Sequence, residues 1–93
     1  MELLYFTSDW CSACENKQTP IINSIEQEYS DRINFQTYDI SNNQNLSSKY
    51  HIHSLPTIII RSKENDSEQI HEKFIGITDE ETIKNCLDEL VNN

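Results

Sequence analysis

Two cysteines separated by two residues are the clearest chemical signal in this chain. Cys11 and Cys14 follow the apolar run Leu3–Phe6 and the aromatic Trp10, and they precede a segment with helical periodicity. A helix that begins at or just after Cys11 directs its unpaired N–H groups and its positive dipole end at that sulfur, which favours the thiolate. Cys14 then lies one turn further on the same face, within disulfide reach. We therefore expect a reversible disulfide that accepts or donates electron pairs.

The composition is that of one small folded domain spanning residues 1–93. A chain of this size buries only about 60–65% of its unfolded surface, so the core must be small. The formal net charge is −9, with 16 acidic and 7 basic residues. Nucleic acids and anionic membrane surfaces bind clustered Lys and Arg, which this chain lacks. We expect neither nucleic acid nor a membrane as a partner.

The N-terminal residues and the cysteine usage indicate the compartment. Met1–Phe6 forms a strand-like run without the basic and long apolar regions of a signal peptide, and no stretch could span a bilayer. Three cysteines, two of them in C-x-x-C, suit a catalytic or metal-binding pair plus one spare rather than a secreted disulfide scaffold. We expect a cytoplasmic protein.

A strand–helix–strand unit places the cysteine pair at the end of a strand. Leu3–Phe6 has the continuous apolar character of a buried strand. Residues from Ser12 to about Tyr29 carry apolar side chains on one helical face, with Pro20 as an internal kink. Ile33–Ile40 alternates in the manner of a second strand. The three elements predict a right-handed βαβ unit.

The second half of the chain predicts a hairpin between two helices. Residues 57–60 are the most β-prone run, and residues 69–75 are their antiparallel partner across a longish polar turn at 62–67. Gly76, the only glycine, ends this hairpin. An Asn-rich loop at 41–45 precedes a short helix at 46–50. A closing helix follows the hairpin, with an N-cap at Thr78 or Asp79. Its apolar stripe consists of Ile83, Cys86, Leu87, Leu90 and Val91.

These motifs together resemble those of the thioredoxin family. The stretch Trp10–Cys14 matches the Trp-Cys-x-x-Cys signature after the first core strand, and Ser54–Thr57 matches the cis-proline loop that opens the third core strand. Gly76 matches the glycine after the last strand. The similarity covers essentially the whole chain, without the extra N-terminal strand and helix of full-length thioredoxins. It implies an α/β, thioredoxin-like three-layer fold, a four-stranded mixed sheet with helices on both faces.

The resemblance also implies an activity, namely reduction of protein disulfides through a Cys11–Cys14 dithiol. No bound cofactor is needed, and electrons would come from a thioredoxin reductase or a glutathione system. An X–Pro bond adopts cis at a cost of only about 0.5–1 kcal/mol, and the proline ring lacks an N–H, which leaves the backbone of the preceding residue, Leu55, free to pair with an extended substrate. The implied substrate groove around Cys11 consists of Trp10, Leu55, Pro56, Ile75 and Gly76.

The sequence departs from the family pattern around the second cysteine. Tyr5 and Thr37 stand where thioredoxins carry a buried Asp and a Lys that assist deprotonation of the resolving cysteine, here Cys14. Water, or a carboxylate such as Asp9 or Glu15, must then accept its proton. We expect slower resolution of the mixed disulfide, by a factor within the about 10²–10⁴ that general base catalysis contributes.

Three further departures affect the redox balance and the helix. Glu15 replaces a common Lys, and its negative charge opposes the helix dipole at the thiols. Ser12 and Ala13 replace the usual Gly-Pro, so the potential and the direction of electron flow stay open. Pro20 lies one residue further from the motif than in the family, which predicts a local bulge in the helix.

Three rival functions remain open on the sequence. The protein could be an oxidase or isomerase for one dedicated client peptide. It could be a metal-binding module that uses Cys11 and Cys14, or a redox-inactive adaptor that borrows the fold for binding.

Other residues could in principle bind a metal or react, but we interpret them more simply. His51 and His53 are of a type that zinc binds, but alternate residues of an extended segment point to opposite faces, so we expect no zinc site and place His53 beside the groove. His71 is predicted to be a solvated strand residue. Cys86 lies on the apolar stripe of the last helix and is predicted to be a buried structural thiol.

Overall fold

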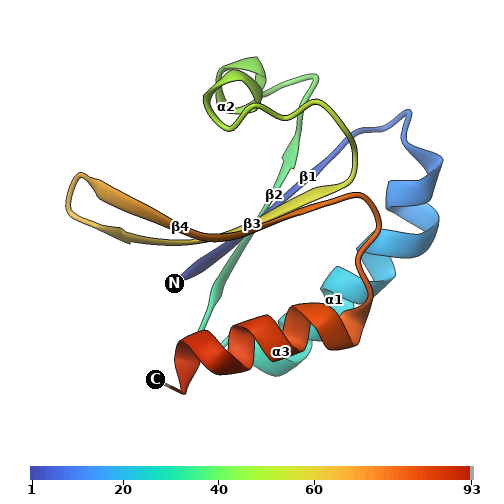
Figure 1. The fold of residues 1–93 in the computed structure, drawn as a ribbon. Coiled ribbons are helices and arrows are strands. Elements are labelled where there is room, and N and C mark those ends of the chain that lie inside the picture. The colour runs from blue at the N-terminus through green and yellow to red at the C-terminus, as the bar shows by residue number, and fades with distance from the viewer. Residues whose placement is uncertain (93) are drawn as a thin grey trace.

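The computed structural model describes residues 1–92 and shows a four-stranded sheet between helices (Figure 1). The strand order is β2-β1-β3-β4. Helices α1 (Thr19–Tyr29) and α3 (Glu80–Val91) lie against one face, and α2 (Gln44–Lys49) lies against the other. The three-layer α/β fold expected from the sequence is therefore confirmed. The strands are β1 (Glu2–Thr7), β2 (Asn34–Asp39), β3 (Thr57–Glu64) and β4 (Ser67–Ile75).

The first helical segment contains the predicted bulge. Residues Cys14–Gln18 form a π-helix, η1, which continues directly into α1 (Thr19–Tyr29). The wider π turn absorbs one residue more than an α turn would. The sequence predicts that Pro20 kinks the interior of a helix. In the structure, Pro20 lies in the first turn of α1. The fixed φ of a proline suits the first turn of an α-helix, and here that turn lies where the π-helix changes to the α-helix.

Two hydrophobic cores flank the central strand β1. Leu3 and Tyr5 belong to the cluster beneath α1 and α3, whereas Leu4 and Phe6 belong to the cluster beneath α2. Successive side chains of a strand point to opposite faces, so a strand covered on both faces must be apolar at every position. The continuous apolar run at 3–6 is confirmed as a buried strand.

The pairing of the strands brings three chain segments to one edge of the sheet. Strand β2 runs parallel to β1, while β3 is antiparallel to both β1 and β4. Phe6 near the end of β1 pairs with Thr57 at the start of β3, and Thr57 pairs with Ile75 at the end of β4. The loop after β1, the loop before β3 and the loop after β4 therefore start side by side.

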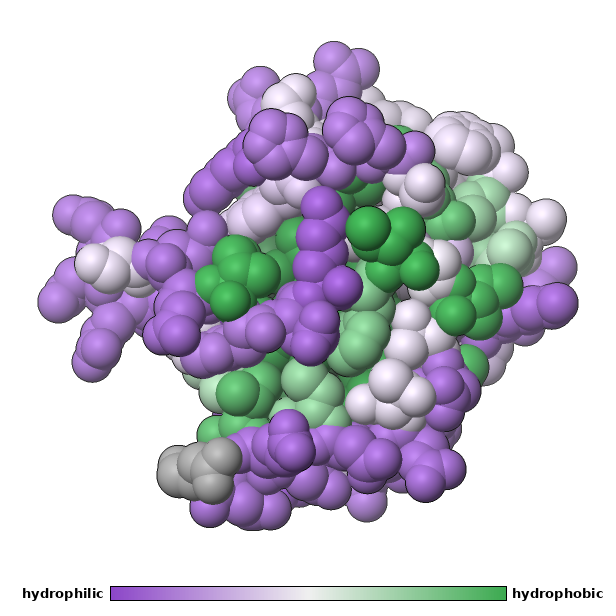
Figure 2. Space-filling model, viewed as in Figure 1, coloured by the Kyte–Doolittle hydropathy of each residue, from purple (hydrophilic) through white to green (hydrophobic). Residues whose placement is uncertain are grey.

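The hairpin of β3 and β4 is longer than the sequence predicted. The strands continue to Glu64 and resume at Ser67, so the turn is Asn65–Asp66 and not the polar stretch 62–67. Asn65 has φ +56°, a left-handed conformation that Asn tolerates in tight turns. Hydrophilic side chains surround the hairpin tip on the left of Figure 2. Near the tip, neither face of the two strands is buried. The sequence there consequently lacks the alternation of apolar and polar residues that indicates a strand.

Smaller features of the second half follow the expectations in part. Asp79 caps α3 (Glu80–Val91) by accepting a hydrogen bond from the Thr82 N–H at 3.2 Å, as predicted. The short helix α2 (Gln44–Lys49) begins two residues earlier than expected. His71 is half-buried rather than solvated, with Nε2 2.6 Å from the Ser62 hydroxyl oxygen. Within residues 1–92, no helix combines the length and the apolar character needed to cross a membrane.

Cys86 is half-buried and not fully buried as predicted. It packs against the core cluster beneath α1 and α3, which is consistent with a structural thiol. Burial raises the pKa of this thiol, and the carboxylates of Glu72 and Glu89 add to that effect. A raised thiol pKa disfavours the nucleophilic thiolate.

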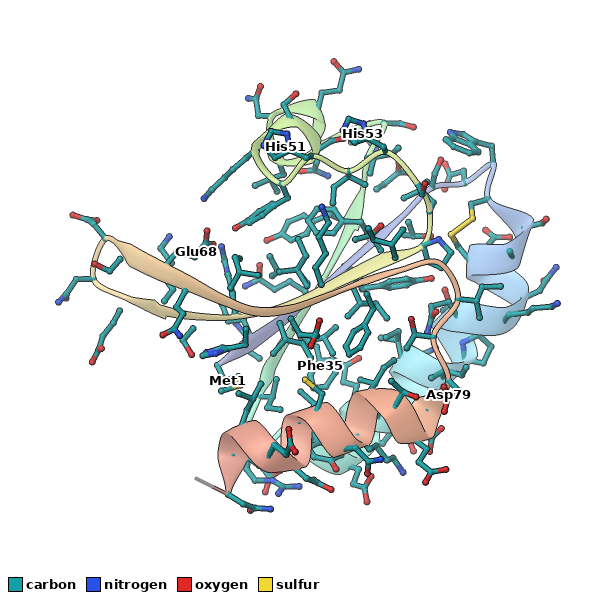
Figure 3. The ribbon with its side chains drawn as sticks, viewed as in Figure 1. Met1, Phe35, His51, His53, Glu68 and Asp79 are labelled. Atoms are coloured by element: carbon teal, nitrogen blue, oxygen red, sulfur yellow. A yellow bond between two sulfur atoms is a disulfide. The ribbon has the colours of Figure 1, made fainter. Side chains whose placement is uncertain are left out.

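A nearly buried arginine organises the α2 side of the hairpin. Arg61 is 8% exposed, and its guanidinium contacts three oxygens: Glu2 Oε1 at 2.9 Å, the Tyr50 hydroxyl at 2.6 Å and Glu68 Oε2 at 2.5 Å. Tyr50 also donates a short hydrogen bond to Glu68, which lies on the hairpin (Figure 3). These partners compensate the cost of removing the arginine charge from water. We call these four residues the Arg61 cluster.

The Arg61 cluster predicts a loss of stability in acid. Burial tends to raise the pKa of the Glu68 carboxyl, but hydrogen bonds from Tyr50 and Arg61 outweigh it and hold that pKa below its ordinary 4.5. A lowered native pKa contributes stability above the unfolded value, and this is lost as the pH falls through the native value. We expect Glu68→Gln to lose less stability than wild type below pH 4.5, as measured by urea unfolding. Parallel pH curves would contradict this, and Glu64→Gln is the exposed control.

Candidate active site

The redox turn, the proline loop and the loop after β4 meet at one edge of the sheet. The cysteine motif follows β1, Pro56 precedes β3, and Gly76 follows β4. The Gly76 N–H donates a hydrogen bond of 2.8 Å to the Pro56 carbonyl oxygen, which joins the last two segments directly. Figure 1 shows these connections at the same end of the sheet, where the helical segment of η1 and α1 also starts with η1.

Cys11 and Cys14 form a disulfide, visible as the yellow bond in Figure 3. Their Cα atoms are 5.3 Å apart, within the usual range for a disulfide. The two residues differ in accessibility, because Cys11 is 8% exposed and Cys14 is 0% exposed. Cys11 is therefore the cysteine of the pair that retains contact with solvent.

Backbone N–H groups gather around Cys11 at the start of the helix. The Cys11 carbonyl oxygen accepts hydrogen bonds from the N–H groups of Cys14 and Glu15, at 3.1 and 3.2 Å. The Cys14 N–H also lies 3.2 Å from the Cys11 Sγ atom. An N–H aimed at a sulfur from a helix N-terminus favours its negatively charged form. The local backbone thus stabilises a thiolate at Cys11 once the disulfide is reduced.

Tyr5, which stands where the resemblance implies a buried Asp, performs a structural task. Its side chain is buried, and its hydroxyl donates a hydrogen bond to the Cys14 carbonyl oxygen at 3.2 Å and lies 2.9 Å from the Thr19 hydroxyl. Thr37 pairs with Tyr5 across the sheet but is exposed on the edge strand. Neither position supplies a charged group that could move a proton from Cys14.

Tyr5→Asp is expected to speed turnover and to lower stability. A carboxylate at position 5 would accept the Cys14 proton, an effect worth up to about 10²–10⁴-fold. The lost aromatic ring and hydrogen bonds would lower the free energy of unfolding by about 3–5 kcal/mol. Stopped-flow rates of mixed-disulfide resolution and urea unfolding measure the two effects. The control Tyr5→Phe loses only the hydroxyl, so it should lower the free energy of unfolding by about 1 kcal/mol without a faster resolution of the mixed disulfide. An unchanged or slower rate of resolution in Tyr5→Asp would contradict the prediction.

The residues expected to line a groove lie around this edge, with different exposure. Trp10 is 70% exposed and Ile75 is 66% exposed, whereas Leu55 is half-buried and packs against the core beneath α2. Pro56 is buried, and the Leu55–Pro56 peptide bond is cis. Gly76 has φ +88°, a conformation that favours glycine. Exposed apolar side chains gathered at one edge are typical of a binding surface.

Two residues near the site were not singled out from the sequence. Ile77 follows Gly76 and is 47% exposed, so it extends the apolar edge. Gln18, the last residue of η1, is 0% exposed although it is polar. Ile77 could have been found as an apolar residue next to the glycine. The only sequence signal for Gln18 is its spacing of four residues from Cys14.

The histidines lie beside the proline loop and not with the cysteines. His51 and His53 are exposed on the α2 side of the sheet (Figure 3), with their ring centroids 6.5 Å apart. They help to line a pocket of about 220 Å³, whose other residues include Thr57, Lys73 and Ile75. In the part of the chain that the structure describes, no three His, Cys, Asp or Glu side chains gather as a metal site.

Comparisons with known proteins agree with this arrangement. The thioredoxin family model matches residues 1–89. The thioredoxin of Buchnera aphidicola is 32% identical over 90 residues, covering 97% of this chain and 79% of that protein. Thioredoxin 1 of Synechococcus elongatus is 29% identical over 86 residues, covering 92% of this chain and 76% of that protein. The structure of Trichomonas vaginalis thioredoxin superimposes with a TM-score of 0.82 at 26% identity, covering 96% of this chain and 78% of that one.

A match along nearly the whole chain, with a cysteine pair joined at the start of the first helix, leads to one conclusion. The chain belongs to the thioredoxin family and is a thiol–disulfide oxidoreductase.

Proposed function

We propose that the protein reduces disulfides in other proteins, with Cys11 as the nucleophile and Cys14 as the resolving thiol. One observation carries the proposal. The Cys11 sulfur lies beside the Cys14 N–H at 3.2 Å, and Cys11 keeps 8% of its surface exposed while Cys14 keeps none. The accessible sulfur is thus the one that the helix start stabilises as a thiolate.

The proposed reaction has two exchange steps. The Cys11 thiolate attacks one sulfur of the substrate disulfide, so that a Cys11–substrate disulfide forms and the other substrate sulfur leaves as a thiolate. Cys14 then loses its proton and attacks the Cys11 sulfur, which releases the second substrate thiolate and leaves the Cys11–Cys14 disulfide. Two electrons pass to the substrate, and its two thiolates take up protons from Cys14 and water.

The exposed edge around Cys11 supports a peptide as the substrate. An extended segment could pair with the backbone at Leu55 and rest on the side chains of Trp10 and Ile75, in the manner of an added strand. Gly76 offers no side chain to obstruct such a segment. We place the client disulfide against the Cys11 sulfur within this groove.

We further propose that a flavin-dependent thioredoxin reductase or a glutathione system regenerates the dithiol. Reduction of the Cys11–Cys14 disulfide requires two electrons per cycle, and reductants of this kind keep cytoplasmic thiols reduced. A cytoplasmic site of action fits this requirement.

Insulin reduction with dithiothreitol as the electron source tests the activity. We expect wild-type protein to accelerate the precipitation of the insulin B chain well above the rate with dithiothreitol alone. Equilibration with glutathione mixtures then distinguishes a reductase from an oxidase. A reductase should have a potential near that of thioredoxin, about −270 mV, whereas a value above about −180 mV would favour the oxidase or isomerase function.

A further inference from the structure

The side chain of Gln18 connects the redox helix with the loop after β4. Its amide Nε2 donates a hydrogen bond to the Thr78 carbonyl oxygen at 3.0 Å, and its Oε1 accepts one from the Thr78 N–H at 2.8 Å. One side chain thereby satisfies both backbone groups of a residue 60 positions away. Because Gln18 is 0% exposed, water cannot readily replace these bonds.

Both ends of this connection lie close to the site. Gln18 ends η1, the helical turn that begins at Cys14, and both residues are completely buried. At the other end, the Thr78 hydroxyl donates a hydrogen bond of 3.1 Å to the Gly76 carbonyl oxygen. The Gly76 N–H in turn bonds to Pro56 at 2.8 Å. A continuous series of hydrogen bonds thus runs from the redox helix to the proline loop.

The segment that Gln18 holds carries exposed apolar side chains. Ile75 and Ile77 are 66% and 47% exposed, and Thr78 follows directly. Within this connection, Gly76 bonds to Pro56 and to the Thr78 hydroxyl, and the Asp79 carbonyl oxygen accepts from the Ile83 N–H. The two bonds of the Gln18 amide are those that tie the segment to the redox helix.

We propose that Gln18 is a positioning residue that holds the segment Ile75–Thr78 against the redox helix, so that a docked peptide presents its disulfide to the Cys11 sulfur. The proposal rests on the reduction of protein disulfides proposed above. It implies that Gln18 serves substrates that occupy the groove more than it serves small disulfides, which reach Cys11 without it.

Gln18→Met tests this role, because Met has a similar volume but no amide. The measured quantity is the ratio of kcat/KM for insulin to kcat/KM for dithionitrobenzoate, a small aromatic disulfide. We expect this ratio to fall about tenfold, mainly through a higher KM for insulin, as misplaced binding groups predict. Gln27→Met, at an exposed position of α1, is the matched control. A merely structural role would lower the melting temperature and leave the ratio unchanged.

A ratio within twofold of wild type in folded Gln18→Met would overturn the proposal, and so would equal losses with both substrates. If that variant does not fold, Gln18→Glu keeps the acceptor for the Thr78 N–H but loses the donor to the Thr78 carbonyl oxygen. Its ratio should also fall below that of wild type, and a ratio within twofold of wild type would overturn the proposal. Hydrogen exchange of wild-type protein is an independent measurement: the Thr78 amide should exchange slowly for a loop, and rapid exchange would overturn the proposal. Failure of wild-type protein to reduce insulin would instead refute the proposed function.

Discussion

Cys11→Ser is expected to abolish insulin reduction, with a loss of at least about 10³-fold relative to wild type. A serine hydroxyl is not ionised near neutral pH and forms no disulfide, so the N–H groups at the helix start have no thiolate to stabilise. Cys14 remains as a thiol, but it is 0% exposed and cannot meet a substrate. The rate of insulin precipitation, compared with dithiothreitol alone, measures the loss.

Two further variants identify the step that fails. Cys14→Ser keeps the nucleophile, so it should form a mixed disulfide with a substrate and stop there, which mass spectrometry detects as a covalent adduct. Cys86→Ser should retain the wild-type rate, because Cys86 is a half-buried thiol against the core of α3. Equal insulin reduction by wild type and Cys11→Ser would refute the enzyme function and favour the adaptor that the sequence left open.

Arg61→Leu is expected to lower the free energy of unfolding by about 3–5 kcal/mol, the range observed when one partner of a buried ion pair is removed. The carboxylates of Glu2 and Glu68 would remain partly buried without their common cation. For a domain of this size, each kcal/mol shifts the melting temperature by about 4–8 °C. Urea unfolding at neutral pH measures the change, and Lys63→Leu, at an exposed position of the same strand, is the control.

Neutralising the two carboxylates tests the cause of this loss. In the Arg61→Leu background, Glu2→Gln and Glu68→Gln together should recover part of the lost stability, since no unpaired charge is then buried. If the Arg61→Leu change costs less than about 1 kcal/mol, the Arg61 cluster behaves as a surface ion pair and contributes little.

Much of the fold follows from local patterns in the sequence. The apolar run at 3–6 predicted the central strand, and the acidic cap at Asp79 predicted the start of the last helix. The resemblance to the thioredoxin family predicted a bulge, because Pro20 lies one residue further from the cysteine motif than in the family. These features depend on residues close together in the chain, where side-chain spacing and backbone preference act directly.

The hairpin shows where local patterns are insufficient. Residues at its tip are polar on both faces, so the sequence indicated a loop at 62–67, yet backbone pairing continues to Glu64 and Ser67. Cross-strand hydrogen bonds do not depend on the side chains that flank them. Polarity alone therefore does not reveal where such a strand ends.

The sequence itself identified the cysteine pair at the start of a helix, because that chemistry is local, and the resemblance to the family added the proline loop and the glycine. Tertiary structure alone decided which cysteine is accessible, that the Tyr5 hydroxyl holds the Cys14 carbonyl, and that Gln18 bonds to Thr78. Each of these depends on contacts between elements far apart in the chain. Such contacts arise when the sheet and helices pack, and a single sequence carries no periodic signal for a buried polar partner 60 residues away.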